Sequence, residues 1–160
     1  DRDSSNYLFP ALNLNTDEIS CAIGIASLKR LPDTIAARLD FVSRVKESLN
    51  KSQVCNAYPS TDNDSPFIYP IFVETAKLHT DKINFAKALI AEGIPLNPHY
   101  MYLVRDWNWV KNYLADDFDT ANARKVRNST FCLFLNENYG PEEAKNVFEA
   151  LVKVENTLMN

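Results

Sequence analysis

The sequence predicts an α+β domain, in which a small antiparallel or mixed sheet is covered by helices and preceded by a long helical arm. Patterned segments follow one another in the order helix, helix, strand, helix, strand, helix, strand, helix. The 160 residues are 46% hydrophobic, which is enough to bury one core, and no internal repeat divides the chain. We therefore expect residues 1–50 to form the helical arm and residues 51–160 to form a single α+β domain.

Two helices are expected in the arm, at residues 16–30 and 33–50. Asn15 or Thr16 can supply the N-cap oxygen of the first helix. Pro32 lacks a backbone N–H and breaks or restarts the helical run, so the arm should be kinked. The apolar face of the first helix should consist of Ile19, Ala22, Ile23 and Ala26.

A strand is expected at residues 67–76, which are aromatic and β-branched, with Pro70 at a sheet edge or bulge. The Pro- and Asp-rich residues before it are typical of a loop. Residues 81–93 predict a helix with Gly93 as its C-cap. The inward face of this helix should consist of Ile83, Ala86, Leu89 and Ile90.

The remaining elements alternate between extended and helical segments. Residues 94–104 should be extended, and residues 106–129 helical or irregular. Residues 130–136 form a continuous apolar run that is typical of a buried strand. A last helix should begin at residues 140–143, where a proline and two glutamates follow a glycine. Its inner face should consist of Ala144, Val147, Phe148, Leu151 and Leu158.

Composition excludes some classes of partner. The net charge of −4 argues against a broad phosphate-binding surface, so no nucleic acid is expected. Cys21, Cys55 and Cys132 are odd in number and far apart, and two lie in apolar runs, which indicates buried free thiols in a reducing compartment. No segment is long and apolar enough to span a bilayer, and the first residues lack the features of a signal peptide. We expect no membrane partner and a cytoplasmic location.

Catalytic motifs are scarce. The Walker A loop, GxGxxG, CxxC and HExxH are all absent, so no metal site of recognised spacing is expected. His79 lies in a polar turn and is expected to be solvated. His99 lies in a proline-shaped loop beside aromatic residues, a setting that suits ligand contact, although a packed histidine is the alternative.

Two acidic pairs and an aromatic cluster have ordinary structural explanations. Residues 116–117 flank a loop, and residues 142–143 begin a helix, so neither pair has the environment of a catalytic carboxylate pair. Trp107, Trp109 and Tyr113 could stack a base or a sugar, but such aromatics more often pack in a core or hinge. The chain shows no nucleophile with a base beside it. It is therefore expected to contribute to a site rather than to hold a complete one.

The stretch "LFPALNLNTDEISCAIGIASLKRL" resembles the segment downstream of the cofactor lysine in the DegT/StrS family of pyridoxal-phosphate (PLP) sugar aminotransferases. Asn13 and Glu18 match the pattern of that family. Ala11, Leu12 and Asn15 stand where the family has a glycine, an aromatic residue and an arginine. Further along, "INFAKALIAEGIPLNPHY" and "STFCLFLNENYGPEEAKNVFEALVKV" resemble the family's next helix and His-Tyr pair, and its closing strand and helix.

The resemblance implies roles for four residues. It places Asn13 against the PLP phosphate of the partner subunit, and an amide N–H suits this contact. A turn or cap residue is the alternative for Asn13. The resemblance places His99 and Tyr100 on the sugar side of the pocket. Asn15, at the arginine position, is the remaining expected substrate-binding residue.

The resemblance also implies a parent enzyme. The chain would be the C-terminal domain of a fold-type I PLP aminotransferase, a homodimer with shared active sites. This enzyme would transfer an amino group from an amino acid, expected to be glutamate, to the keto-sugar of a nucleotide sugar. The Schiff-base lysine and the N-terminal large domain would lie upstream, so these residues should be inactive alone. Two alternatives stay open: a PLP-dependent sugar dehydratase of the same family, with histidine in place of the lysine, and a stand-alone binding or interaction module without catalysis.

Overall fold

The computed structural model describes residues 12, 15–100 and 102–159, and it has the predicted α+β architecture. Its α-helices are α1 (Glu18–Leu49), α2 (Lys82–Ala91), α3 (Ala121–Ser129) and α4 (Pro141–Leu158). Its strands are β1 (Cys55–Ala57), β2 (Ile68–Val73), β3 (Leu96–Asn97) and β4 (Thr130–Phe134). Short 3-10 helices lie at Thr75–Lys77, Val104–Asp106 and Asn108–Tyr113. None of the described helices combines the length and the apolar character required to cross a membrane.

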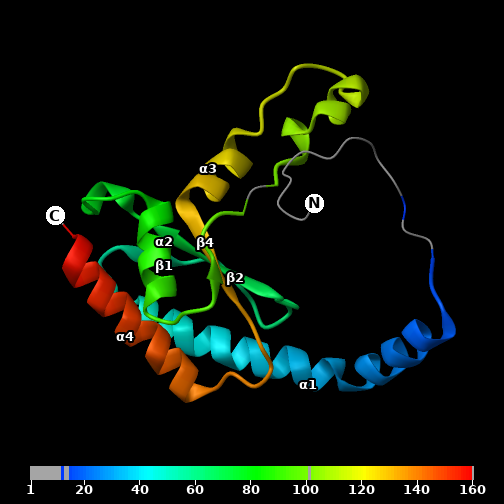
Figure 1. Cartoon of the computed structure of the whole chain (residues 1–160), viewed down its shortest axis with the longest axis horizontal. Coiled ribbons are helices and arrows are strands. Elements are labelled where there is room, and N and C mark those ends of the chain that lie inside the picture. Colours follow the sequence, from blue (N-terminus) through cyan, green and yellow to red (C-terminus); the bar gives the residue numbers. More distant parts are fainter. Residues whose placement is uncertain (1–11, 13–14, 101, 160) are drawn as a thin grey trace.

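The strands form one antiparallel sheet in the order β1-β2-β4-β3. In the central β2–β4 pair, Ile71 lies opposite Phe131 and Tyr69 lies opposite Leu133. These side chains are buried in one core with residues of α1, α2 and α4, which lie together on one side of the sheet (Figure 1). Because one face of the sheet carries the core, the alternate residues of β2 and β4 point to the opposite face, where α3 contacts both strands.

The strands differ from the predicted ones in extent. Pro70 was expected at an edge or bulge but lies in the inner strand β2, opposite Cys132. The β1–β2 ladder ends with the pair Ala57–Ile71, so no ladder hydrogen bond is required of Pro70 on that side. The short strand β1 was missed by the sequence pattern, and β3 occupies only two residues of the expected 94–104.

α1 is one continuous helix where two were expected. Pro32 lies inside it and is exposed. A proline in a helix removes one backbone hydrogen bond, which bends the helix without necessarily ending it, and α1 is curved (Figure 1). The N-cap is Asp17, not Asn15 or Thr16, and its Oδ1 accepts the backbone N–H of Ser20 at 2.7 Å.

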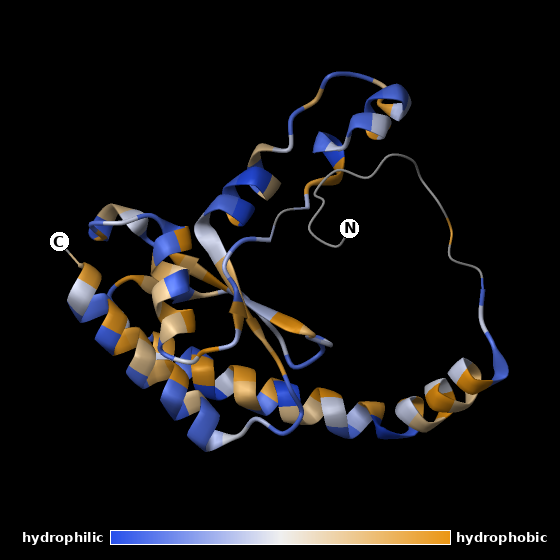
Figure 2. Ribbon diagram, viewed as in Figure 1, coloured by the Kyte–Doolittle hydropathy of each residue, from blue (hydrophilic) through white to orange (hydrophobic). Residues whose placement is uncertain are grey.

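The first half of α1 extends away from the sheet (Figure 1), and its apolar side chains are exposed in the described part of the chain. Ile19 is 73% exposed and Ile23 is 62% exposed, and Figure 2 shows hydrophobic residues along this half of the helix. Cys21 is exposed as well, so the expectation of a buried thiol holds for Cys55 and Cys132 but is wrong there. The helix reaches the core only in its second half. Its buried residues are Phe41, Val42, Val45 and Leu49.

α2 buries a different face from the one predicted. Ile83 and Ile90 are exposed, whereas Lys82 and Phe85 are buried together with the expected Ala86 and Leu89. The Phe85 ring packs 6.4 Å from the ring of Phe131 in the central strand. Phe85 is the larger apolar side chain, so its burial stabilises the core more than burial of either isoleucine would.

α2 ends at Ala91, and the predicted glycine closes the turn that follows it. Gly93 has φ of +91°, a left-handed conformation that a residue with a Cβ atom rarely adopts. Its N–H donates to the carbonyl of Ile90 at 2.9 Å, and the N–H of Ile94 donates to the carbonyl of Leu89 at 3.1 Å. This pair of bonds is a Schellman motif, which satisfies two free carbonyls at the helix end.

α4 begins as predicted and is held to the α1–β1 turn by a buried glutamate. Its N-cap is Gly140, whose N–H donates to Oε2 of Glu143 at 2.8 Å. Glu155 is 4% exposed and accepts hydrogen bonds from Oγ of Ser52 and, at 3.3 Å, from the backbone N–H of Gln53. Ala144, Val147 and Leu151 are buried as expected, while Phe148 and Leu158 are only half-buried.

Replacing Gly93 by alanine should lower the free energy of unfolding by about 1 kcal/mol, because a left-handed residue with a Cβ atom is strained by roughly that amount. Denaturant unfolding measures the change. Gly24→Ala is the matched control, since Gly24 lies within α1 and a Cβ there meets no atom within 4 Å. That control should not lower stability, because alanine is the better helix former. Equal losses in the two variants would contradict the cap at Gly93.

Glu155→Gln should destabilise the protein by about 1–3 kcal/mol, because an NH2 group replaces one of the two oxygens that accept from Ser52 and Gln53, and so leaves one buried hydrogen bond unmade. Glu149→Gln, on the exposed side of the same helix, should change stability by less than about 0.5 kcal/mol. Unfolding midpoints of both variants in urea test this. A neutral Glu155→Gln would mean that the buried carboxylate does not hold α4 to the turn.

Candidate functional site

Lys82 is a buried charged residue, only 4% exposed. Its Nζ lies 2.8 Å from the carbonyl oxygen of Thr130, 3.0 Å from that of Arg127 and 2.9 Å from Nδ1 of His99. These partners belong to the start of β4, the last turn of α3 and the loop after β3. One side chain therefore joins three segments that are far apart in the sequence.

The local sequence explains why this lysine points inward. Oδ1 of Asp81 accepts the N–H of Asn84 at 2.8 Å, so α2 is capped at residue 81 and begins at Lys82. Lys82 precedes Phe85 and Ala86 by three and four residues, so all three lie on the buried face. Its stem follows the apolar stripe of α2, and its charged end reaches the end of α3.

The end of α3 suits a cation. The last carbonyls of a helix lack partners within the helix and carry partial negative charge. Burial lowers the pKa of the Lys82 ammonium, and the nearby charge of Arg127 acts in the same direction. The two carbonyls offset this cost by hydrogen bonding.

His99 is held from two sides. Its backbone N–H donates to Oδ1 of Asn97 at 3.0 Å, which shapes the turn after β3. Its ring is half-buried, and burial lowers the pKa of the imidazole, with the charges of Lys82 and Arg127 adding to the effect. Burial and the two neighbouring cations therefore favour the neutral form of the imidazole. Sequence reasoning singled out His99 but missed Lys82, because a lysine at the start of a helix is normally a surface residue.

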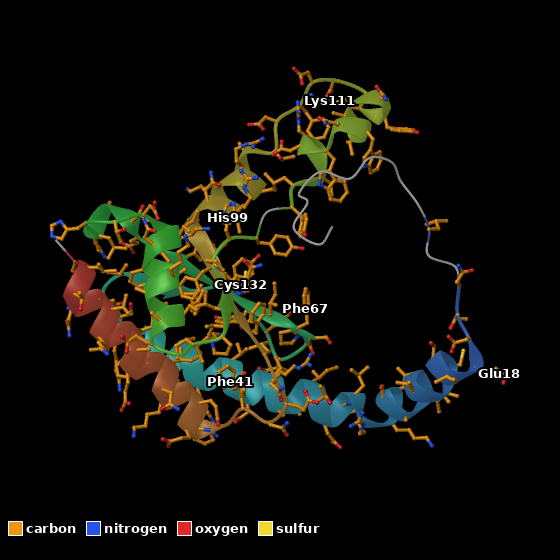
Figure 3. All side chains as sticks on the ribbon, viewed as in Figure 1. Glu18, Phe41, Phe67, His99, Lys111 and Cys132 are labelled. Carbon is orange, nitrogen blue, oxygen red and sulfur yellow. The ribbon has the colours of Figure 1, made fainter. Side chains whose placement is uncertain are left out.

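An open hollow of about 530 Å³ lies beside this pair. It is bounded by the N-terminal end of α2, by the turn before it and by the end of α3. Lys82 and His99 form part of its wall, and Figure 3 shows His99 close to the end of α3. The other lining residues are Thr75, Thr80, Asp81, Ile83 and Asn128.

Tyr100 follows His99 directly but lines a different hollow. Tyr100 is 39% exposed. Its ring packs edge-on against the ring of Tyr102, with 5.5 Å between the ring centroids. Both tyrosines border a mostly apolar hollow of about 350 Å³ on the face of the sheet that carries Pro70 and Cys132. The expected pair thus presents an imidazole to one hollow and a phenol to the other.

Of the two asparagines of the expected site, only Asn15 can be placed, and it is separated from this region. Asn13 lies outside the described residues. Asn15 is exposed just before α1, and Figure 3 shows Glu18, at the start of that helix, far from His99. Within one chain, the structure therefore does not bring Asn15 and His99 together.

The other candidates have structural roles. His79 is exposed, as expected. Asp117 forms an ion pair with Arg105, and the ring of Trp109 packs 6.0 Å from Trp107 and 5.9 Å from Tyr113. These contacts lie within the projecting segment between β3 and α3 (Figure 1). No cluster of His, Cys, Asp or Glu among the residues with described positions is arranged to hold a metal ion.

Known proteins share this fold. An aminotransferase from Psychrobacter cryohalolentis superposes with a TM-score of 0.74 at 15% identity, over 92% of this chain and 41% of that one. Spr1654 from Streptococcus pneumoniae, described as a sugar aminotransferase and solved in its PLP form, gives 0.72 at 23% identity, over 91% and 37%. The GDP-4-keto-6-deoxy-D-mannose-3-dehydratase of E. coli, with bound hydrated PLP, gives 0.68 at 19% identity, over 91% and 38%. A comparison with curated protein sequences gives no match.

At these identities the structural likeness shows the fold, and the chain spans about two fifths of the length of the solved chains. Two of the three were solved with PLP, the cofactor that the sequence resemblance implied. The model of a protein family gives the assignment, because it matches residues 2–152, nearly the whole chain. The chain belongs to the DegT/DnrJ/EryC1/StrS aminotransferase family, as its resemblance to DegT/StrS enzymes had indicated.

Proposed function

We propose that the protein is a PLP-dependent aminotransferase that moves an amino group from an amino acid, glutamate in our proposal, to the keto-sugar of a nucleotide sugar. The observation that carries the proposal is the family match over residues 2–152. The likeness in fold to proteins described as aminotransferases, Spr1654 among them, supports it. In this proposal residues 1–50 form the linking arm and residues 51–160 the C-terminal small domain.

The described residues do not form a PLP site by themselves. PLP chemistry needs a lysine amine that is free to react with the cofactor in a pocket. Lys82 is the buried lysine of the described part, and its Nζ is already bonded to three acceptors. The carboxylate of Asp81, beside it, caps α2. We therefore assign the Schiff-base lysine to a part of the protein outside these residues, where bound PLP would supply the electron sink.

The separation of the expected site residues supports a dimer with shared sites. Asn15 lies at the far end of α1 from His99, so the two can serve one site only if they come from different chains. We propose that Asn13 and Asn15 of one subunit complete the site that His99 and Tyr100 of the other subunit border. A symmetric dimer makes two such sites.

The exposed first half of α1 supports the same arrangement. Its apolar side chains, with Ile19 and Ile23 among them, have no cover in the described chain. Such a surface is typical of a contact with another domain or chain. It counts against a stand-alone binding module, which would be expected to cover its own apolar surface.

A sugar dehydratase is the second candidate, because the dehydratase from E. coli matches the fold nearly as well as Spr1654 does. The residue at the position of the Schiff-base lysine separates the two candidates, since a histidine there would indicate the dehydratase.

Borohydride reduction of the full-length protein loaded with PLP, followed by peptide mass spectrometry, tests the proposal. A single pyridoxyl-lysine outside the 160 residues is expected, and Lys82→Met should leave it unchanged. No adduct would favour the dehydratase or the binding module. An adduct on a lysine within these residues would contradict the assignment of the site.

Subunit complementation tests the shared site. The Asn13→Ala variant should bind PLP about tenfold more weakly, since it loses one hydrogen bond to a charged group. A variant that lacks the reactive lysine should form no adduct at all. When the two are co-expressed, about a quarter of all sites should regain tight, reducible PLP, because half the dimers are mixed and each mixed dimer has one intact site. Co-expressed protein that behaves as the average of the two variants would mean that each site is built within one chain.

A further inference from the structure

Lys82 and His99 are joined by one hydrogen bond, and the geometry around Nζ shows which of the two residues donates it. An ammonium has three N–H donors and no acceptor. Nζ of Lys82 has three partners, at 2.8, 3.0 and 2.9 Å, and two of them are backbone carbonyl oxygens, which only accept. The third proton of the ammonium therefore points to Nδ1 of His99, which must accept with its lone pair.

The reverse arrangement would need a neutral amine. In it, Lys82 would donate to the two carbonyls and accept from an N–H at Nδ1 of His99. The position of Nζ argues for the charged form, because the carbonyls of Arg127 and Thr130 lie at the C-terminal end of α3, where a cation is stabilised. The charged side chain of Arg127 opposes the ammonium, and the carboxyl of Asp81 favours it. The side chain of Cys132, in β4, acts in the same direction as Asp81.

We propose that Lys82 is a positioning residue, which fixes His99 as the tautomer that carries its proton on Nε2 and so presents a neutral N–H donor to a ligand. Because Nδ1 is occupied by the ammonium, Nε2 is the ring nitrogen left to bond a ligand. His99 borders the 530 Å³ hollow, so a ligand there meets a donor of fixed orientation.

The chemistry of the ligand follows from this donor. An Nε2–H bonds an acceptor oxygen, such as a hydroxyl or carbonyl oxygen, and it cannot act as a general base without first losing its proton. The tautomer depends on Lys82 alone, whereas the identity of the acceptor as a sugar oxygen rests on the proposed function. An uncharged N–H donor suits an uncharged oxygen better than a phosphate.

Nuclear magnetic resonance of the full-length protein with ¹⁵N- and ¹³C-labelled histidine tests the tautomer directly. The His99 signals are identified by their loss in His99→Gln. The wild-type ring at pH 7.5 should show a protonated Nε2 and an unprotonated, hydrogen-bonded Nδ1. A protonated Nδ1 in the wild type would overturn the proposal, whatever the variants do.

Variants at Lys82 separate positioning from simple packing. Lys82→Met should give a mixture of tautomers and a higher titration midpoint for His99, because the nearest cation is removed. Lys82→Arg keeps the cation and should retain the Nε2–H form. Lys87→Met, an exposed lysine of the same helix, is the matched control and should leave His99 unchanged. Folding of each variant is checked by thermal unfolding, and an unchanged His99 in folded Lys82→Met would overturn the proposal.

Kinetics then connect the tautomer to the substrate. If the ligand is the keto-sugar, Lys82→Met should raise its KM about tenfold, the effect of one hydrogen bond, while the reaction with the amino donor stays unchanged. Failure of the positioning role can be distinguished from failure of the proposed aminotransferase function. A fixed Nε2–H without any pyridoxyl-lysine would leave the positioning role intact and remove the aminotransferase.

Discussion

The burial of one face of a four-stranded sheet is the constraint on which the rest of the domain depends. β2 and β4 lie in the middle of the sheet and direct Ile71 and Phe131 to the same side. Such a small sheet is not stable unless helices cover its apolar face. The second half of α1, together with α2 and α4, supplies that cover. The polar bonds at Gly93 and Glu155 hold the ends of these elements in place.

Lys82 is a charged exception within this apolar cover, and it contacts His99 of the proposed site. A buried ammonium is costly unless each of its protons has an acceptor. Here the acceptors come from α3, β4 and the loop that carries His99, so satisfying the charge also fixes the relative positions of these segments. The same contact orients the imidazole beside the open hollow. The hydrogen bonds of Lys82 therefore both hold these segments together and set the orientation of His99.

The fold also separates what the family resemblance places together. α1 must reach the sheet with its second half, so its first half projects and carries Asn15 away from His99. A long helix keeps this separation because its backbone hydrogen bonds continue past Pro32. The exposed isoleucines of the projecting half and the distant asparagine both agree with a site completed by another chain. In the proposed dimer, the apolar surface of the arm would contact the subunit whose site Asn15 completes.

Local pattern was sufficient for much of the fold. The α+β class, the Gly93 cap, the start of α4 at Pro141 and the buried run in β4 all follow from propensity and spacing, which act over a few residues. The resemblance indicated the family and made His99 a candidate. Tertiary packing decided the rest. It let α1 continue through Pro32, turned Phe85 rather than Ile83 inward, and brought Lys82 to Nδ1 of His99. These outcomes depend on contacts between residues far apart in the chain, and a buried lysine is stable only where three acceptors from other segments converge, which no local pattern records.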